Sequence, residues 1–254
     1  MPVDSNRFVE VAVVPRRAYL PLPDLEVIER PGWLQLVTPS FKNGGFNEVS
    51  FAVLGADADA VIDATIAQYR ELGCKFRWIV GPDSAPADLG ERLARRGLVR
   101  SISHAMIRST ETAVDGADDR ADDVTIDRVD GTTIDAFTQA MAEGWSVEPG
   151  PLARANELAL GGSSHRMYLA RVGGEPAATA ASVLFERSVY LLGAVVLPRF
   201  RRRGLYRALV AARLRDAATA GRTLATSHAR AETSAPLLAR LGFDTVCTFD
   251  VFSG

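Results

Sequence analysis

The sequence predicts an α/β protein made of two related halves. Strand-like apolar runs alternate with segments of helical spacing along most of the chain, as expected for strands and helices packed in layers. Residues 93–98 (LARRGL) and 238–243 (LARLGF) nearly repeat one another, and each follows a strand–helix–strand unit and precedes a final strand. An acidic run, residues 111–123, separates the two patterns. Together these observations indicate a repeated α/β unit whose first copy is shortened at its start.

The first half becomes regular only after residue 45. Prolines interrupt any long helix before that point, so only short strands at 9–14 and 33–38 are expected there. The rest of this half is expected to contain a strand at 46–54, a helix at 56–73, a strand at 75–81, a helix at 86–97 and a strand at 98–107. Gly73 closes its helix, where a left-handed cap favours glycine.

The acidic run carries six carboxylates and one arginine. Such a segment buries too little apolar surface to offset the entropy of ordering it. It is therefore expected to be a solvated linker, which divides the chain into residues 1–110, 111–123 and 124–254.

The second half shows a fuller set of elements. Thr132 and Asp135 resemble a capping box that opens a helix through Ala142. Gly173 and Gly174 indicate a hairpin turn, and residues 161–166 are expected to form a loop with a solvated His165. The expected strands are 124–129, 167–172, 176–186, 189–197, 223–229 and 243–252, and the expected later helices are 205–221 and 234–242.

Composition limits the possible functions. The 254 residues are 47% hydrophobic and 24% charged with a net charge of -2, which excludes a wholly disordered or coiled-coil chain and argues against a dedicated nucleic-acid binder. Cys74 and Cys247 lack metal-ligand spacing, so reduced core residues and no metal site are expected. The longest apolar run is far shorter than the roughly 20 residues that span a bilayer, and no signal pattern begins the chain, so a cytoplasmic protein is expected.

Residues 195–210 carry the most informative chemistry. An apolar strand ends at Pro198, a basic loop follows, and Gly204 precedes an amphipathic helix. The arginines around the start of that helix are Arg199, Arg201, Arg202, Arg203 and Arg207. A cation at a helix N-terminus costs roughly 0.3–1 kcal/mol, whereas a bound phosphate would use the free amides, the helix dipole and the guanidinium groups together. A solvated basic turn and a patch for nucleic-acid phosphates are the alternatives, and the strand–loop–glycine–helix context favours a phosphate site.

This segment resembles a known family. PRFRRRGLYRAL is similar to the acetyl-CoA pyrophosphate loop of the GNAT N-acetyltransferase superfamily, with Arg201 and Gly204 at fixed places and Tyr206 where a small residue is usual. Four residues match the closing helix-and-strand motif of the family: Leu237, Leu241, Gly242 and Phe243. The resemblance covers residues 124–254 and extends more faintly to the first half, so the chain is expected to hold two GNAT-like halves.

The resemblance implies a mixed sheet in which the strands at 189–197 and 223–229 splay apart around acetyl-CoA. The pantetheine arm would bond to the backbone of Val195 and Leu197, an amide near Val196 would polarise the thioester, and the diphosphate would rest on the amides of residues 202–207. The implied cofactor-binding set is Val195, Val196, Leu197, Arg201, Arg202, Arg203, Gly204, Leu205, Tyr206, Arg207 and Ser227.

The groups that move protons are less evident. The frequent tyrosine and asparagine of the family correspond to Leu238 and Ala231, which cannot donate a proton. The candidate catalytic residues are His228, Ser234 and Tyr206, each with an alternative as a surface, capping or packing residue. The candidate residues for the acceptor site are Trp145, Glu148 and Trp78, with core indoles and a surface carboxylate as the alternatives.

The first half lacks the basic loop. Asp57 and Asp59 stand at the corresponding helix start, where carboxylates would repel a diphosphate, so this half is expected to be a scaffold. The chain is expected to move an acyl group from acetyl-CoA to a primary amine of a small molecule or peptide, as a monomer or homodimer without nucleic acid or membrane. A non-catalytic acyl-CoA-binding or sensing module is the alternative, and an interaction domain that uses the arginines is a third possibility.

Overall fold

A computed structural model describes residues 5–43, 45–114 and 123–254. The strands of the N-terminal half are β1 (Glu26–Arg30), β2 (Trp33–Val37), β3 (Glu48–Ala52), β4 (Arg77–Val80) and β5 (Val99–Ser109). Those of the C-terminal half are β6 (Val124–Arg128), β7 (His165–Val172), β8 (Glu175–Leu184), β9 (Ser188–Val196), β10 (Leu224–Arg230) and β11 (Asp244–Ser253).

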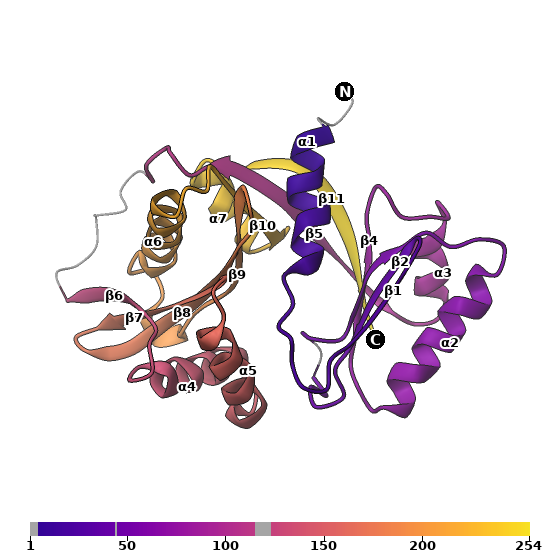
Figure 1. Cartoon of the computed structure of the whole chain (residues 1–254), viewed down its shortest axis with the longest axis horizontal. Helices are drawn as coiled ribbons and strands as arrows, with labels where there is room; N and C mark the ends of the chain where they lie inside the picture. Colours follow the sequence, from indigo (N-terminus) through magenta and orange to yellow (C-terminus); the bar gives the residue numbers. More distant parts are fainter. Residues whose placement is uncertain (1–4, 44, 115–122) are drawn as a thin grey trace.

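Within the described residues these strands form one 11-stranded sheet in the order β1-β2-β3-β4-β11-β5-β10-β9-β8-β7-β6 (Figure 1). Strands β3 and β4 are parallel, and so are β9 and β10. The other neighbours are antiparallel, so the sheet is mixed. The predicted fold class, α/β with a mixed sheet flanked by helices, is confirmed.

The last strand of each half pairs with the other half. Strand β5 lies between β10 and β11, and β11 lies between β4 and β5. The antiparallel register joins Leu224 to Ser109 in one pair and Asp250 to Val80 in the other. Neither half therefore completes its part of the sheet with its own strands, an exchange that the sequence analysis does not foresee.

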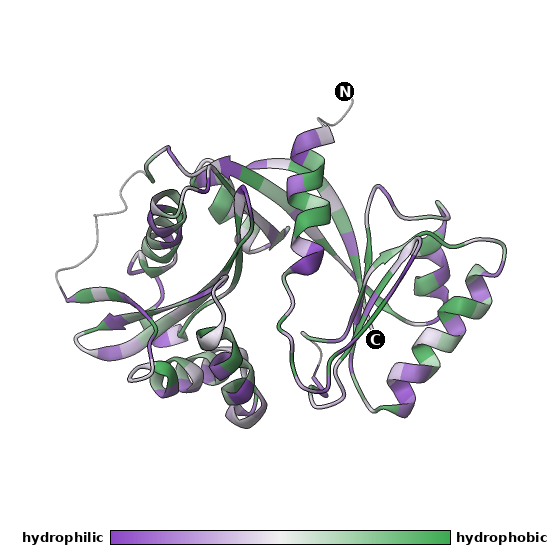
Figure 2. Ribbon diagram, in the orientation of Figure 1, coloured by the Kyte–Doolittle hydropathy of each residue, from purple (hydrophilic) through white to green (hydrophobic). Residues whose placement is uncertain are grey.

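Helices cover both faces of the sheet. On one face lie α2 (Ala58–Glu71), α3 (Leu89–Arg95), α6 (Leu205–Thr219) and α7 (Ser234–Arg240), and on the other lie α4 (Ile134–Trp145) and α5 (Pro149–Gly161). The alternation along β10 shows this division, because Ala225 and Ala229 pack among α6 and α7 while Leu224 packs with Val11 near the N-terminus. Green and purple stripes along the helices in Figure 2 mark their buried and solvated sides.

The N-terminal segment is helical and crosses the middle of the sheet, on the face that carries α4 and α5. It consists of α1 (Ser5–Phe8), η1 (Val9–Val13) and η2 (Val14–Arg17), so the strand predicted at 9–14 is wrong. Val11 and Ala12 are buried against Ala105, Ile107 and Phe249. A short apolar run does not distinguish helix from strand, and the central strands already have neighbours on both sides, so no free sheet edge exists there.

Two local predictions in the C-terminal half are also wrong. Asp130 accepts the amides of Thr132 at 2.9 Å and Thr133 at 3.1 Å, so this carboxylate, and no capping box between Thr132 and Asp135, organises the turn before α4. The loop expected at 161–166 is limited to residues 162–164, because Gly161 ends α5 and His165 begins β7. His165 is half-buried there, and burial lowers its pKa.

Other predictions are confirmed. Gly73 ends α2 with a φ of 63°, and Gly173 and Gly174 turn the β7–β8 hairpin with φ of 56° and 85°. Both cysteines are free, with Cys74 buried and Cys247 half-buried. The predicted acidic linker lies mostly outside the described residues, so the division at 111–123 stays a prediction.

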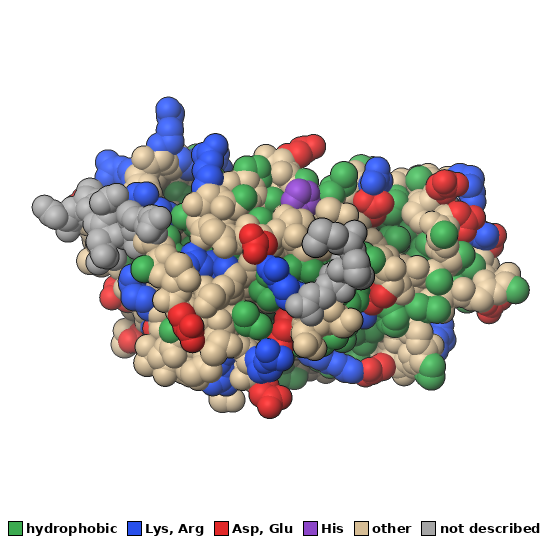
Figure 3. Space-filling model, turned by 90° about the horizontal axis from the view of Figure 1, so that it is seen from above, with side chains coloured by type: hydrophobic (Ala, Val, Ile, Leu, Met, Phe, Trp, Pro, Cys, Tyr) green, Lys and Arg blue, Asp and Glu red, His purple; other side chains and the backbone are tan. Residues whose placement is uncertain are grey.

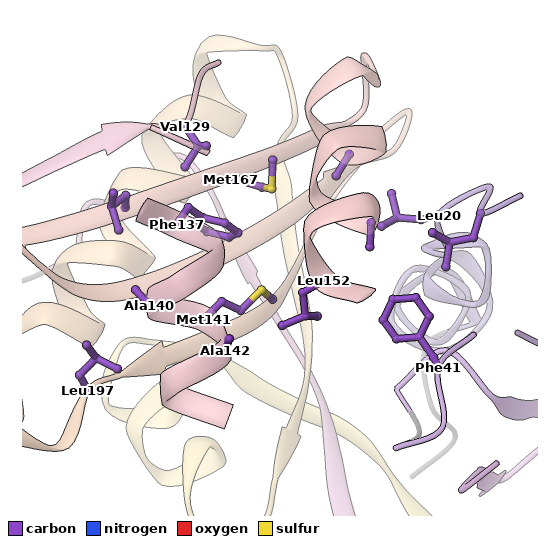
Figure 4. Close-up of a cluster of buried hydrophobic side chains, with 14 residues drawn as sticks. Leu20, Phe41, Val129, Phe137, Ala140, Met141, Ala142, Leu152, Met167 and Leu197 are labelled. Carbon is purple, nitrogen blue, oxygen red and sulfur yellow. The ribbon is translucent and has the colours of Figure 1, made fainter. Parts of the chain in front are cut away.

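The two halves also meet through an apolar contact on the face of α4 and α5. Leu20 and Phe41 of the N-terminal half share a buried cluster with Phe137, Met141 and Leu152. Figure 4 shows Phe41 and Leu20 facing α5 and Leu152 from the side of the N-terminal half. This contact joins the two halves on the sheet face that carries α4 and α5.

Candidate active site

Strands β9 and β10 separate part-way along their length. Their parallel pairing runs from Ser188 and Leu224 to Tyr190 and Thr226 and then stops, although both strands continue. At that point the Ser227 hydroxyl donates to the carbonyl of Leu191 at 3.0 Å. The predicted splay is thus present, and the outer edge of β9 beyond this point has no strand partner among the described residues.

The register along β9 decides which backbone groups face the gap. Leu197 donates its amide to Ala177 at 3.0 Å and accepts the Phe200 amide at 2.9 Å, so the prediction of free backbone groups at Leu197 is wrong. Because backbone groups alternate along a strand, Val195 also faces β8, where it pairs with Thr179. Val196 faces the gap instead, and its carbonyl lies 3.5 Å from Arg201 Nε.

The loop after β9 leads into α6 through an unusual backbone path. A short turn, η3 (Pro198–Phe200), is followed by Arg202 and Gly204, with φ of 65° and 76°. Ala208 makes the first helical bond, to the Gly204 carbonyl at 3.0 Å. The amides of residues 205–207 therefore precede the helical ladder and point out of the positive end of the helix dipole. A left-handed non-glycine residue such as Arg202 is a strained feature that often marks a functional loop.

The arginines of this loop have different surroundings. Arg199 bonds to Glu143 and, at 2.9 Å, to Glu175, so its charge is balanced. Arg203 reaches Asp123 at 3.4 Å. Arg201 and Arg202 are exposed and Arg207 is half-buried, and within the described part of the chain none of the three has a carboxylate partner. Figure 3 shows several blue side chains on the C-terminal half of the molecule.

This arrangement has a family counterpart. Residues 132–243, which include the gap, the loop and α6, match the Acetyltransferase (GNAT) family. This segment belongs to the GNAT acetyltransferases. The resemblance noted in the sequence is confirmed, and residues 132–243 form a GNAT acetyltransferase domain. No curated protein matches the chain by sequence.

Solved structures share the fold of the whole chain, including its N-terminal half. A GCN5-related N-acetyltransferase from Kribbella flavida is 15% identical with a TM-score of 0.67, over 100% of this chain and 96% of that one. A functionally unknown conserved protein from Staphylococcus epidermidis is 12% identical with a TM-score of 0.68, over 92% and 95%. A tandem GNAT protein from the clavulanic acid biosynthesis pathway is 12% identical with a TM-score of 0.60, over 96% and 87%. The chain thus has a tandem GNAT fold.

His228 of the GNAT domain lies beside the point where the strands separate. Its ring lies between Tyr190 and Phe249, with centroids 5.2 Å and 4.9 Å away, and its Nε2 is 2.6 Å from the carbonyl of Val11. Because a carbonyl only accepts, Nε2 must carry a proton, which leaves Nδ1 as the acceptor of the neutral ring. Burial lowers the pKa of His228, so the neutral form prevails at pH 7.

The sequence analysis missed Tyr190 and Val11. Burial raises the pKa of Tyr190, so its phenol is a proton donor and not a base. Tyr190 could have been noticed as a polar aromatic residue in an otherwise apolar strand, next to the predicted splay. Val11 acts only through its backbone carbonyl, which no residue pattern reveals.

The end of α4 lies close to β9. A Cβ at Gly144 would lie 2.7 Å from both γ-carbons of Val195, and one at Gly193 would lie 3.6 Å from the Trp145 ring. Trp145 is 42% exposed, so its indole covers the gap region and is no core residue. Glu148 is exposed at the start of α5, and its side chain makes no capping bond. Both side chains are thus exposed, and Trp145 lies beside β9 next to the gap.

The remaining candidates have different positions. Trp78 is fully buried in the N-terminal core, edge-on to Trp33 at 5.5 Å, so its predicted place in the acceptor site is wrong. Tyr206 packs half-buried in the cluster that contains Leu238, and burial raises its pKa. Ser234 begins α7 without a capping bond from its side chain. None of these three contacts His228 through a hydrogen bond within the described residues.

The N-terminal half has closed the corresponding gap with its own chain. Strands β3 and β4 pair only at Glu48–Arg77 and Val49–Trp78. Beyond that point Ala85 donates its amide to Ala52 at 3.1 Å and accepts the Leu54 amide at 2.9 Å, so it takes the place of a bound strand. In addition, Asp59 at the start of α2 pairs with Arg92 and Arg96 of α3.

No helix in the described part of the chain is long and apolar enough to cross a bilayer.

Proposed function

We propose that the chain transfers an acetyl group from acetyl-CoA to a primary amine of a small molecule or peptide, at the gap between β9 and β10. One observation carries this proposal: the edge of β9 that lacks a strand partner leads directly into a loop whose free amides meet arginines at the start of α6, and three of these arginines have no carboxylate partner among the described residues. The edge suits an extended, amide-bearing arm, and the loop suits a diphosphate.

The residues present fit acetyl-CoA, which supplies an activated acetyl thioester when bound. The carbonyl of Val196 would accept from a pantetheine amide as that of a neighbouring strand does. The amides of residues 205–207 and the guanidinium groups of Arg201, Arg202 and Arg207 would hold the diphosphate. Because Ala85 already fills the other gap, we propose one cofactor site per chain.

The chain supplies groups suited to proton movement during transfer. An amine that gains an acetyl group must lose one proton, and the neutral His228 can accept it on Nδ1 because the Val11 carbonyl holds the proton on Nε2. The coenzyme A thiolate that leaves as the amide forms must gain a proton, and the phenol of Tyr190, 5.2 Å from His228 between ring centroids, is a donor on the same face. The Val196 amide can donate a hydrogen bond to negative charge that develops in the gap.

Two measurements test the function. Calorimetric titration with coenzyme A should give one site per chain, and thiol release from acetyl-CoA should accelerate when a primary amine is added. Two sites per chain would contradict the closed N-terminal gap. Absence of binding would contradict the whole assignment, because the diphosphate loop is its basis.

A non-catalytic acyl-CoA-binding module is the second candidate. Leu238 favours it, because this fully buried leucine stands where the family often has a proton-donating tyrosine. Binding without amine-dependent thiol release, over a broad amine panel, would support this candidate and contradict the transferase.

The pH dependence of transfer should report His228. Since burial lowers the pKa of this ring, the active neutral form is present above that pKa and is lost as the pH falls through it. The acidic limb of the pH profile of kcat should therefore have an apparent pKa below the ordinary histidine pKa of about 6.5. His228→Gln should reduce kcat by roughly 10²–10⁴-fold and remove this limb. A variant with an unchanged acidic limb would show that another group accepts the proton.

A further inference from the structure

A pair of charged residues on the N-terminal half lies on the sheet face that carries the proposed acetyl-transfer centre. Val49 and Trp78 are buried in the core beneath α2 and α3. Because side chains alternate along a strand, the neighbouring Glu48 and Arg77 point to the opposite face of the sheet, which is the face of His228 and the N-terminal helical segment. Ser50 shares this face with Glu48.

The geometry of the pair leaves Arg77 with spare donors. Arg77 Nη2 bonds to one oxygen of Glu48 at 2.6 Å, and the Ser50 hydroxyl donates to the other oxygen at 2.6 Å. The carboxylate is thus held on both sides, and its own side chain is only 18% exposed. The Arg77 side chain is 45% exposed, and the other two nitrogens of its guanidinium group have no partner within the described residues. Glu48 therefore fixes the guanidinium and leaves part of its fork open to solvent.

The pair lies close enough to the centre to act on it electrostatically. Besides the larger effect of burial, Glu48 raises and Arg77 lowers the pKa of both Tyr190 and His228. These residues come from opposite halves, which the apolar contact of Leu20 and Phe41 with α5 holds together. Because the pair and His228 lie on one face of the sheet, an acceptor amine bound at His228 can extend along this face toward the open side of Arg77.

We propose that Arg77, oriented by Glu48 and Ser50, binds an acidic group of the acceptor, so that the substrate is an amine that also carries a carboxylate. The proposal rests on the proposed acetyl transfer and specifies its substrate class. A guanidinium fork binds a carboxylate through two parallel hydrogen bonds, which gives orientation as well as charge recognition. The N-terminal half, which binds no cofactor in our proposal, thereby has a role in choosing the acceptor.

A matched set of amines tests this selectivity. The probes are the ω-amino acids from glycine to 6-aminohexanoate, each compared with the alkylamine of the same chain length. For at least one length, the amino acid should be favoured over its alkylamine in kcat/KM by about tenfold or more, the size of one charge-assisted contact. Arg77→Gln should bring this ratio close to one while leaving the affinity for coenzyme A unchanged. Calorimetric binding of the preferred amino acid to the coenzyme A complex should weaken in parallel.

The control is Arg17→Gln, which removes a similar ion pair, with Glu29, from an exposed position on the same half. This variant should keep the native ratio. Equal use of both probes by the native protein, a preference for the alkylamine, or a ratio that Arg77→Gln does not change would each overturn the proposal and leave acetyl transfer intact. Absence of both coenzyme A binding and amine-dependent thiol release would overturn the proposed function, and the substrate class with it.

Discussion

Charge reversal at Arg201 and Arg202 together is expected to weaken coenzyme A binding at least about 100-fold. Each arginine is exposed and has no carboxylate partner within the described residues, so it is available to a diphosphate. One charge-assisted hydrogen bond contributes roughly 1.5–3 kcal/mol, and every 1.4 kcal/mol is about tenfold in affinity. Two glutamates would also repel the ligand. Titration calorimetry measures the loss, and thermal unfolding should show the fold unchanged, because neither side chain is buried.

The matched control is Arg215→Glu. Arg215 is exposed on α6 itself, but it lies more than two turns beyond the start of the helix, where the dipole and the free amides no longer act. Its reversal carries half the charge change of the double variant, because one arginine-to-glutamate change replaces two, and it should leave the affinity within about twofold. Equal losses in both variants would indicate a nonspecific charge effect. Unchanged affinity in the double variant would remove the diphosphate site from α6.

The second large effect concerns the exchanged strands: residues 124–254 expressed alone should not reach the native fold. Strand β11 lies between β4 and β5, and both of these neighbours belong to the N-terminal half. Phe249 and Phe252 on β11 are 2% and 1% exposed in the whole chain. Exposing one such side chain costs roughly 1.5–3 kcal/mol, a large part of the roughly 5–15 kcal/mol that stabilises a typical domain. Near-ultraviolet circular dichroism and gel filtration of the fragment measure the outcome.

A nicked full-length chain is the appropriate comparison for this fragment. A protease site inserted into the acidic run at 115–122 cuts the connection without removing any strand. The two pieces should co-elute after cleavage and separate only in denaturant, because β5 and β11 hold them together. A monomeric 124–254 fragment with native near-ultraviolet signal and coenzyme A affinity would show that the exchange is dispensable.

Local patterns made much of this fold predictable. Alternating strand and helix segments located most elements, and the glycines at 73, 173 and 174 marked turns that require positive φ. The basic loop before α6 also follows from the sequence, because its arginines contradict the preference of a helix start for negative charge. These features depend on neighbouring residues, which a single sequence reports directly.

The rest depends on contacts between distant residues. Nothing local distinguishes a final strand that returns to its own half from one that crosses to the other, so the exchange of β5 and β11 could not be foreseen. The same limit explains the two tryptophans, since Trp78 is buried by α2 and α3 while Trp145 stays exposed at the end of α4. Likewise, the closure of the N-terminal gap depends on the backbone of Ala85 and not on its side chain.

The exchange of β5 and β11 also reduces the number of sheet edges at which another chain could add a strand. Two separate sheets would have four outermost strands, whereas the continuous sheet of the described residues has two, β1 and β6. Each of these has five residues and ends in charge, with Glu29 and Arg30 on β1 and Asp127 and Arg128 on β6. Short, charged edges are poor templates for a foreign strand. Fusing the halves thus protects the chain from edge-to-edge association with its own copies.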